Sequence, residues 1–92
     1  QIGKYKLEGG GACPEQYDVF DENNKEVAYL RLRHGKFRAE VPFGGERVYT
    51  ACPNGDGFFE DDEREKYLTE AILAIDKKLN HETNQTIFGH HP

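Results

Sequence analysis

Four cationic side chains lie within eight consecutive residues of the stretch "YLRLRHGKFRAEV". They are Arg31, Arg33, Lys36 and Arg38, and His34 lies among them. Guanidinium groups are planar and fork onto the oxygens of phosphates and carboxylates. The four occupy alternate positions on either side of a His-Gly pair that favours a tight turn. If the stretch forms a hairpin, its cations share one face and could bind an anion.

The segments around this hairpin predict an antiparallel meander. Apolar and polar residues alternate over 16–20, 27–33, 36–41 and 47–51, and turn-forming residues separate these segments. Two-residue turns at Asn23-Asn24 and His34-Gly35 fix the register. The register pairs Leu32 with Phe37, Leu30 with Ala39 and Tyr17, and Ala28 with Val41 and Val19. All of these side chains fall on one side of the sheet, as a correct register requires.

One helix is predicted after the sheet. It opens in "FEDDERE" and runs to about Lys78, with apolar residues at helical spacing. Asp61 or Asp62 is expected to cap it, and the acidic first turn matches the helix dipole.

The predicted fold class is therefore α+β. A four-stranded antiparallel meander, with a fifth edge strand at Lys4 to Leu7 as an alternative, is packed on one face by a single C-terminal helix. We expect residues 1–11 to form an arm or edge strand, 12–80 to form one domain, and 81–92 to form a polar tail.

The opposite sheet face collects the basic residues. The register places Arg31 across from Arg38 and Arg33 across from Lys36. Tyr29 shares this face, and Arg47 and Tyr49 join it if the last strand keeps its alternation. The surface residues that could bind a ligand are thus Tyr29, Arg31, Arg33, Lys36, Arg38 and Tyr49. Aromatic rings among cations offer stacking platforms for the bases of a nucleotide or a single-stranded nucleic acid.

Three other interpretations of this face compete with ligand binding. Acidic neighbours could turn the cations into a solvated charge lattice with no ligand. A protein partner could also bind here, since Tyr and Arg are enriched at interface hot spots. An apolar patch of Phe20, Val27 and Tyr29 could instead form a homodimer interface.

The acidic run Glu60, Asp61, Asp62 and Glu63 supports an alternative function. We interpret it first as a helix start. As a binding surface it could mimic nucleic acid toward a basic partner protein, such as a host protein, and thereby inhibit it.

Composition limits the function classes. The chain of 92 residues has 17 acidic and 12 basic side chains and a net charge of −5, which argues against binding nucleic acid over its whole surface. Its core is too small for a deep cleft. It contains no serine, and no paired acid and base is evident, so we expect neither an enzyme nor a cofactor. No apolar run could span a membrane and no secretory signal is visible, so we expect a cytoplasmic protein.

Metal binding is not expected. Cys13 and Cys52 flank the meander at the His34 end of the sheet, where they could form a disulfide, ligate a metal or stay reduced; the reduced state is favoured because the outer strands are far apart and no Cys-x-x-Cys pair occurs. "PNGDGFFEDDE" fails as a calcium loop because Phe59 stands where the loop needs glycine. The pair His90-His91 lies in the expected tail.

Two resemblances bear on function. The segments "CPEQYDVFD", "YLRLRHG" and "GDGFFEDDERE" resemble a family of short, uncharacterised bacterial and phage proteins, a likeness that spans roughly Cys13 to Ile75. A phage or mobile-element origin would imply an inhibitor of host defence. The order of three strands and a helix, with "GKFRAEV" and "ERVYTA", resembles DNA-binding domains of the ethylene-responsive type and arm-binding domains of phage integrases. That likeness implies nucleic-acid contact through Arg31, Arg33, Lys36 and Arg38.

The leading hypothesis is a small non-catalytic protein that binds an anionic ligand, either a nucleotide or a nucleic acid, through a basic and aromatic sheet face. The alternative is an acidic protein-protein inhibitor.

Overall fold

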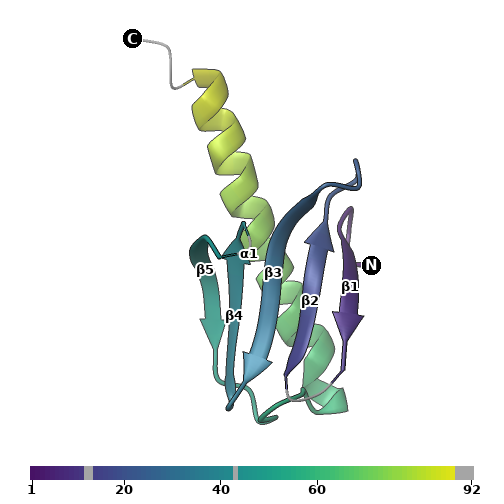
Figure 1. Ribbon diagram of the computed structural model, residues 1–92. Coiled ribbons are helices and arrows are strands. Elements are labelled where there is room, and N and C mark those ends of the chain that lie inside the picture. The colour runs from purple at the N-terminus through teal and green to yellow at the C-terminus, as the bar shows by residue number, and fades with distance from the viewer. Residues whose placement is uncertain (12–13, 43, 89–92) are drawn as a thin grey trace.

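The sheet consists of five strands in sequential antiparallel order. The computed structural model describes residues 1–11, 14–42 and 44–88, and the side chains up to Asn80. The strands are β1 (Lys6–Gly10), β2 (Glu15–Phe20), β3 (Glu26–Arg33), β4 (Lys36–Val41) and β5 (Glu46–Ala51), and the helix is α1 (Asp61–Phe88) (Figure 1). The predicted α+β class and antiparallel meander are confirmed, and the fifth edge strand is present. It begins two residues later than predicted and runs through Gly9, where a β-carbon would lie 2.3 Å from the carbonyl oxygen of Gln16.

The predicted register is confirmed along the β2–β3–β4 unit. Leu30 pairs with Ala39 and with Tyr17, Leu32 pairs with Phe37, and Ala28 pairs with Val19. The described β3–β4 ladder ends at Tyr29 and Glu40, one position short of the predicted pair Ala28 and Val41.

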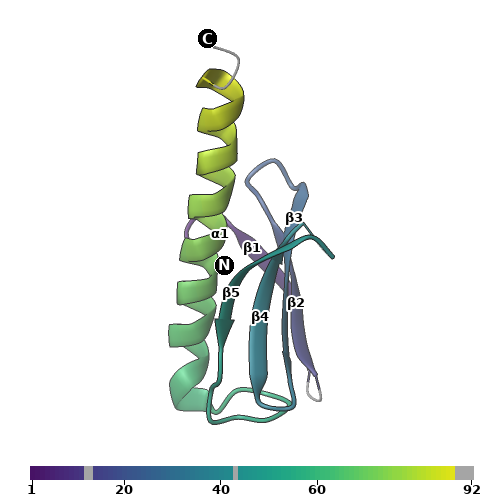
Figure 2. The ribbon, with the colours of Figure 1, turned by 90° about the vertical axis from the view of Figure 1, so that its left-hand side faces the viewer.

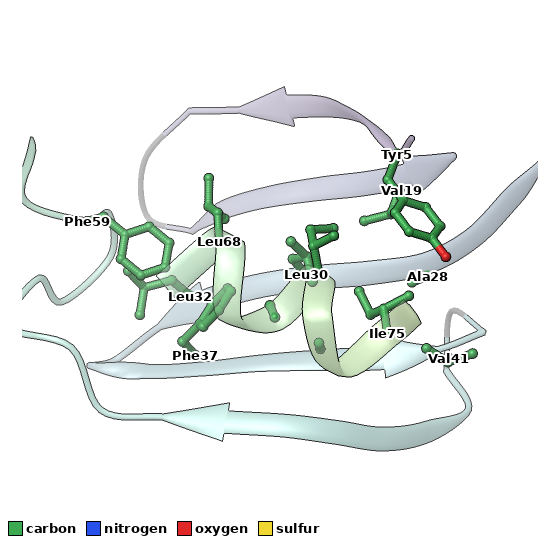
Figure 3. Close-up of a cluster of buried hydrophobic side chains, with 13 residues drawn as sticks. Tyr5, Val19, Ala28, Leu30, Leu32, Phe37, Val41, Phe59, Leu68 and Ile75 are labelled. Carbon is green, nitrogen blue, oxygen red and sulfur yellow. The ribbon is translucent and has the colours of Figure 1, made fainter. Parts of the chain in front are cut away.

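The sheet and the helix share one apolar core. Leu30, Leu32 and Phe37 are at most 1% exposed and belong to one cluster with Leu68 and Ile75 of α1 (Figure 3). Figure 2 shows α1 running alongside the sheet. We call the side of the sheet that carries Leu30, Leu32, Phe37 and Ala39 the core face, and the opposite side the outer face.

The two hairpin turns differ from each other. His34 and Gly35 both have positive φ, 55° and 73°, as the predicted two-residue turn requires. The β2–β3 connection is longer than the predicted Asn23-Asn24 turn. The Asp21 carboxylate accepts the backbone N–H groups of Asn23 and Lys25, and the β2–β3 ladder shifts register after Val19. An aspartate at the start of a turn offers the backbone this local alternative.

The first turn of α1 contains a buried glutamate. The Glu63 carboxylate accepts the N–H of Glu60 and those of Asn54 and Gly55. A side chain at the third helical position that reaches back to the capping residue is half of a capping box. The predicted cap at Asp61 or Asp62 is therefore one or two residues late, and Glu60 occupies that position.

The helix is longer than predicted. It spans 28 residues and ends at Phe88 instead of near Lys78, and it extends past the end of the sheet (Figure 1). Residues 58–88 contain no glycine or proline, so nothing in the sequence ends the helix before Gly89. His90 and His91 lie outside the described residues.

Within the described part of the chain, no helix combines the length and the apolar character that crossing a membrane needs.

Candidate functional site

The outer-face cations are positioned by the β3–β4 hairpin. Arg31 pairs with Arg38 and Arg33 pairs with Lys36 across the ladder, as predicted. Side chains alternate along a strand, so these four point away from the core face on which Leu30 and Leu32 lie. The loop between β5 and α1 secures the turn, because the N–H of Gly35 donates to the carbonyl of Asp56 at 2.9 Å.

A second anchor holds the same loop to β2. The Glu15 carboxylate is 2% exposed and accepts hydrogen bonds from the Tyr17 hydroxyl, the Phe59 N–H and Arg64 Nε. Burial alone would raise the pKa of Glu15, but these hydrogen bonds outweigh it and hold the pKa below its usual value. Burial and the same contact raise the pKa of Tyr17 to about 12. The hydrogen bonds around Glu15 therefore anchor the loop before α1 to the end of β2 that lies beside the β3–β4 turn.

The outer face is hollowed at this end into a groove of about 920 Å³. The side chains that supply its positive charge are Arg31, Arg33, Lys36, Arg38 and Arg47. His34, Thr50 and Cys52 also line it, whereas no acidic residue of the described chain does. We call this site the basic groove.

Carboxylates neutralise little of this charge. Arg38 Nε lies 2.7 Å from a Glu40 carboxylate oxygen. Burial alone would raise the pKa of Glu40, but the contact with Arg38 and the N–H of Gly44 holds it below its usual value. Among the residues the structure describes, no carboxylate lies within 4.0 Å of the charged nitrogens of Arg31, Arg33, Lys36 or Arg47. Glu40 also lies opposite Arg47 in the β4–β5 ladder, and the charge of Arg47 helps to lower the pKa of Glu40. A charge lattice is therefore formed around Glu40, and it does not extend to Arg31, Arg33 or Lys36 by any described ion pair.

Arg31 also carries a hydrogen-bond donor without an acceptor. Its Nε atom is buried and has no hydrogen-bond partner in the described structure. A buried donor without an acceptor costs free energy. No carboxylate of the described residues lies within ion-pair distance of this guanidinium.

Tyr29 lies on the predicted face but offers little surface. It is only 8% exposed, and its hydroxyl donates to Gln16 Oε1. Of its two partners in the proposed dimer patch, Val27 packs against the core and Phe20 lies under the Lys6 ammonium, which is 5.4 Å from the ring centre. A base could stack on little of the Tyr29 ring.

Tyr49 lies on the core face, and its predicted place beside Arg47 is wrong. It pairs with Ala39, donates its hydroxyl to Glu70 of α1 and packs edge-on against Phe37. The cause is a register shift between Ala39 and Glu40, which inserts one residue into β5. Such a bulge moves every later side chain to the other face.

The same shift explains what the sequence prediction missed. Thr50 pairs with Arg38 and lies in the basic groove in the place assigned to Tyr49, while Arg47 pairs with Glu40 and stays on the outer face. The adjacent apolar residues Val48 and Tyr49, which break strict alternation, were the available signal for a bulge.

The acidic run divides into a buried and an exposed part. Glu63 is 7% exposed; burial alone would raise its pKa, but the three backbone N–H groups on its carboxylate keep the pKa below its usual value. It supports the helix and is not available to a partner. Glu60, Asp61 and Asp62 are exposed, and Asp61 pairs with Arg64 at 3.0 Å.

No group of three or more metal-binding side chains occurs among the described residues. Cys52 is a free, exposed thiol, whereas Cys13 lies outside the described ranges. Comparisons with protein-family models, with curated proteins and with solved structures gave no match.

Proposed function

We propose that this protein binds an anionic ligand, a nucleotide or a nucleic acid, in the basic groove, and that it does so without turnover. In this proposal α1 covers only the core face, so the outer face stays open to the ligand. The supporting observation is the set of five cations around one groove. Arg38 forms an ion pair with Glu40 and Arg47 lies opposite the same carboxylate, whereas Arg31, Arg33 and Lys36 form no described ion pair.

The electrostatics support this function more than a solvated charge lattice does. Like charges directly opposite each other on neighbouring strands destabilise a sheet. Here two such pairs adjoin, Arg31 with Arg38 and Arg33 with Lys36. A bound phosphate would accept hydrogen bonds from guanidinium forks and offset the repulsion.

A thermal-shift series tests the proposal. The purified protein is heated at low ionic strength with nucleotides, cyclic dinucleotides, short single-stranded oligonucleotides and inorganic phosphate. A ligand at about 100 times its Kd stabilises the folded state by about 2.7 kcal/mol, which is a rise of several degrees in a domain of this size. We expect Arg31→Ala/Arg38→Ala to remove the shift.

The matched control is Lys25→Ala/Lys77→Ala, which removes the same charge from two exposed positions outside the groove. A shift that survives in the groove variant, or that both variants lose equally, would place the binding elsewhere. Nucleotide turnover that persists in the groove variant would argue for an enzyme instead.

A second candidate function rests on the exposed acidic residues. Glu60, Asp61 and Asp62 form a compact exposed group at the start of α1 in a chain of net charge −5. They fit an inhibitor that meets a basic partner protein. Under that candidate, reversing these three charges abolishes inhibition and Arg31→Ala/Arg38→Ala does not, whereas ligand binding in the groove predicts the opposite.

A further inference from the structure

The basic groove has the charges for phosphate recognition but little surface for base recognition. The two tyrosines expected to stack on a base are unsuited to it: Tyr29 is nearly buried, and Tyr49 lies on the core face. Phe37, which also borders the groove, is 1% exposed. The accessible polar groups are cations, an imidazole, a hydroxyl and a thiol.

The cations form a compact cluster. Facing residues on antiparallel strands have β-carbons about 5 Å apart, and alternate residues on one strand are about 7 Å apart. Arg31, Arg33, Lys36 and Arg38 therefore stand at the corners of a small rectangle, and Arg47 lies one outer-face position further along, on β5 opposite Glu40. Several phosphate oxygens on adjacent groups could reach different corners at once.

Carboxylates adjoin the rectangle along the strands, and one of them, Glu40, lies between Arg38 and Arg47. Tyr29 is the next outer-face residue after Arg31, and its ladder neighbours are Asp18 and Glu40. Beyond the turn, Asp56 shares a smaller hollow with Arg33 and His34. A long polyanion running along the strands would leave the cations and meet negative charge within about one Debye length, roughly 8 Å at physiological salt.

The cluster also ends across the strands. The ladder neighbours of Arg31 and Arg38 on their outer sides are Gln16 and Thr50, and neither carries a charge. No row of cations continues toward β1 on the described outer face, where Gly10 pairs with Gln16. The groove therefore favours a ligand whose negative charges are concentrated in a small volume. It is less suited to an extended strand of nucleic acid.

We propose that the basic groove holds a compact polyphosphate chain, a triphosphate or longer, through its oxygens alone and without selecting a base. The chain can be free or belong to a nucleotide, since both present the same anionic oxygens. This inference depends on the proposed anion-binding function and narrows its ligand class.

Calorimetric titration without divalent cations tests the inference. The ligands are inorganic tripolyphosphate, four nucleoside triphosphates that differ only in base, a nucleoside, inorganic phosphate and a single-stranded oligonucleotide. We expect the triphosphates and tripolyphosphate to bind with Kd values within a few-fold of one another, and the nucleoside not to bind. We expect Arg33→Ala/Lys36→Ala to weaken tripolyphosphate binding by about tenfold or more per cation removed, a factor that corresponds to about 1.4 kcal/mol.

A chemical footprint localises the ligand. Cys52 is exposed and lines the groove, so bound tripolyphosphate should slow its alkylation by iodoacetamide. Mass spectrometry of the peptide that contains Cys52 gives the rate. Lys25→Ala/Lys77→Ala is the charge-matched control and should keep both the affinity and the protection.

The outcomes separate the two proposals. A tenfold or larger preference for one base, or nucleotide binding without tripolyphosphate binding, would overturn the polyphosphate inference and leave the proposed function standing. Oligonucleotide binding that tripolyphosphate cannot displace would do the same and favour an extended strand. If no anion binds, or if binding ignores Arg33→Ala/Lys36→Ala, both proposals fail.

Discussion

Arg31 and Arg38 stand directly opposite each other on β3 and β4, so two guanidinium groups adjoin on the outer face of the sheet. Glu40 lies 2.7 Å from Arg38, whereas Arg31 has a buried Nε without a partner. A facing pair of like charges costs a few tenths of a kcal/mol up to about 1 kcal/mol. Functional sites often retain such destabilising arrangements, because substitutions that favour the free fold tend to harm binding.

Reversing one of the two charges should therefore stabilise the free protein. In Arg31→Glu the facing pair becomes attractive, and we expect the free energy of unfolding to rise by about 0.5–1 kcal/mol at low salt. High salt should shrink the gain, because it screens both the repulsion in the wild type and the attraction in the variant. Urea denaturation at two ionic strengths measures the effect.

Lys77→Glu is the control, since it makes the same charge change at an exposed helix position away from the facing pair. It should not reproduce the gain. A less stable Arg31→Glu variant would mean that packing of the half-buried arginine stem outweighs the charge repulsion.

The Cys52 thiol allows the electrostatic potential in the basic groove to be tested without a ligand. It is exposed among the groove cations, so anionic iodoacetate should be concentrated near it relative to neutral iodoacetamide. In a Cys13→Ala background Cys52 is the single thiol of the chain. We expect the ratio of the iodoacetate rate to the iodoacetamide rate to fall several-fold in Arg33→Ala/Lys36→Ala and at high salt.

The same ratio in Lys25→Ala/Lys77→Ala should equal that of the Cys13→Ala parent. If the ratio does not respond to removal of the groove cations, the potential at Cys52 comes from elsewhere in the molecule.

The β3–β4 hairpin was predictable from sequence because two independent signals agree on its register. The His34-Gly35 pair suits the positive φ angles of its turn, and alternation places Leu30 and Leu32 on the core face. The four hairpin cations could therefore be placed correctly. Strict period-two patterning specifies a face only while no residue is inserted.

The last strand and the helix start show where this reasoning failed. A bulge in β5 moved Tyr49 to the core face. The adjacent apolar residues Val48 and Tyr49 indicated an irregularity, but its position depends on how β5 packs against β4. Glu63 resembled its acidic neighbours in sequence. Its role depends on the N–H groups of Asn54 and Gly55, and only the folded loop brings these to it.

Glu63 should make the free energy of unfolding depend on pH. Its folded-state pKa lies below the usual value, so as the pH falls the unfolded state takes up a proton before the folded state does. The stabilisation from Glu63 is complete above the unfolded carboxyl pKa of about 4.5 and is lost as the pH falls below it. In Glu63→Gln we expect a loss of about 1–2 kcal/mol at neutral pH and a shallower decline below pH 4.5.

Chemical denaturation across pH 3–7 measures both effects, and Asp62→Asn is the control because Asp62 is exposed in the same helical turn. Equal slopes for Glu63→Gln and the wild type would mean that the Glu63 carboxylate is not the group that titrates.

Arg64 should contribute to stability mainly through the buried Glu15. Two of its guanidinium nitrogens bond the Glu15 carboxylate, at 2.8 and 3.2 Å, and the arginine side chain is 34% exposed. Removing one partner of a fully buried pair costs about 3–5 kcal/mol, and partial exposure of Arg64 reduces the expectation for Arg64→Ala to about 2–3 kcal/mol. Loss of the cation also raises the pKa of Glu15, so Arg64→Ala should begin to lose stability at a higher pH than the wild type does.

A double-mutant cycle isolates this pair. In Glu15→Gln/Arg64→Ala the buried charge is gone, so we expect the double variant to be more stable than the sum of the two single losses implies, by about 1 kcal/mol or more. Asp61→Asn removes the exposed partner of Arg64 and should cost only a few tenths of a kcal/mol, because exposed ion pairs contribute little. Additive losses in the cycle would show that Tyr17 and the Phe59 N–H alone stabilise the Glu15 carboxylate. The loop that carries Asp56 to the hairpin turn would then be held without the arginine, and Arg64→Ala would leave the shape of the basic groove intact.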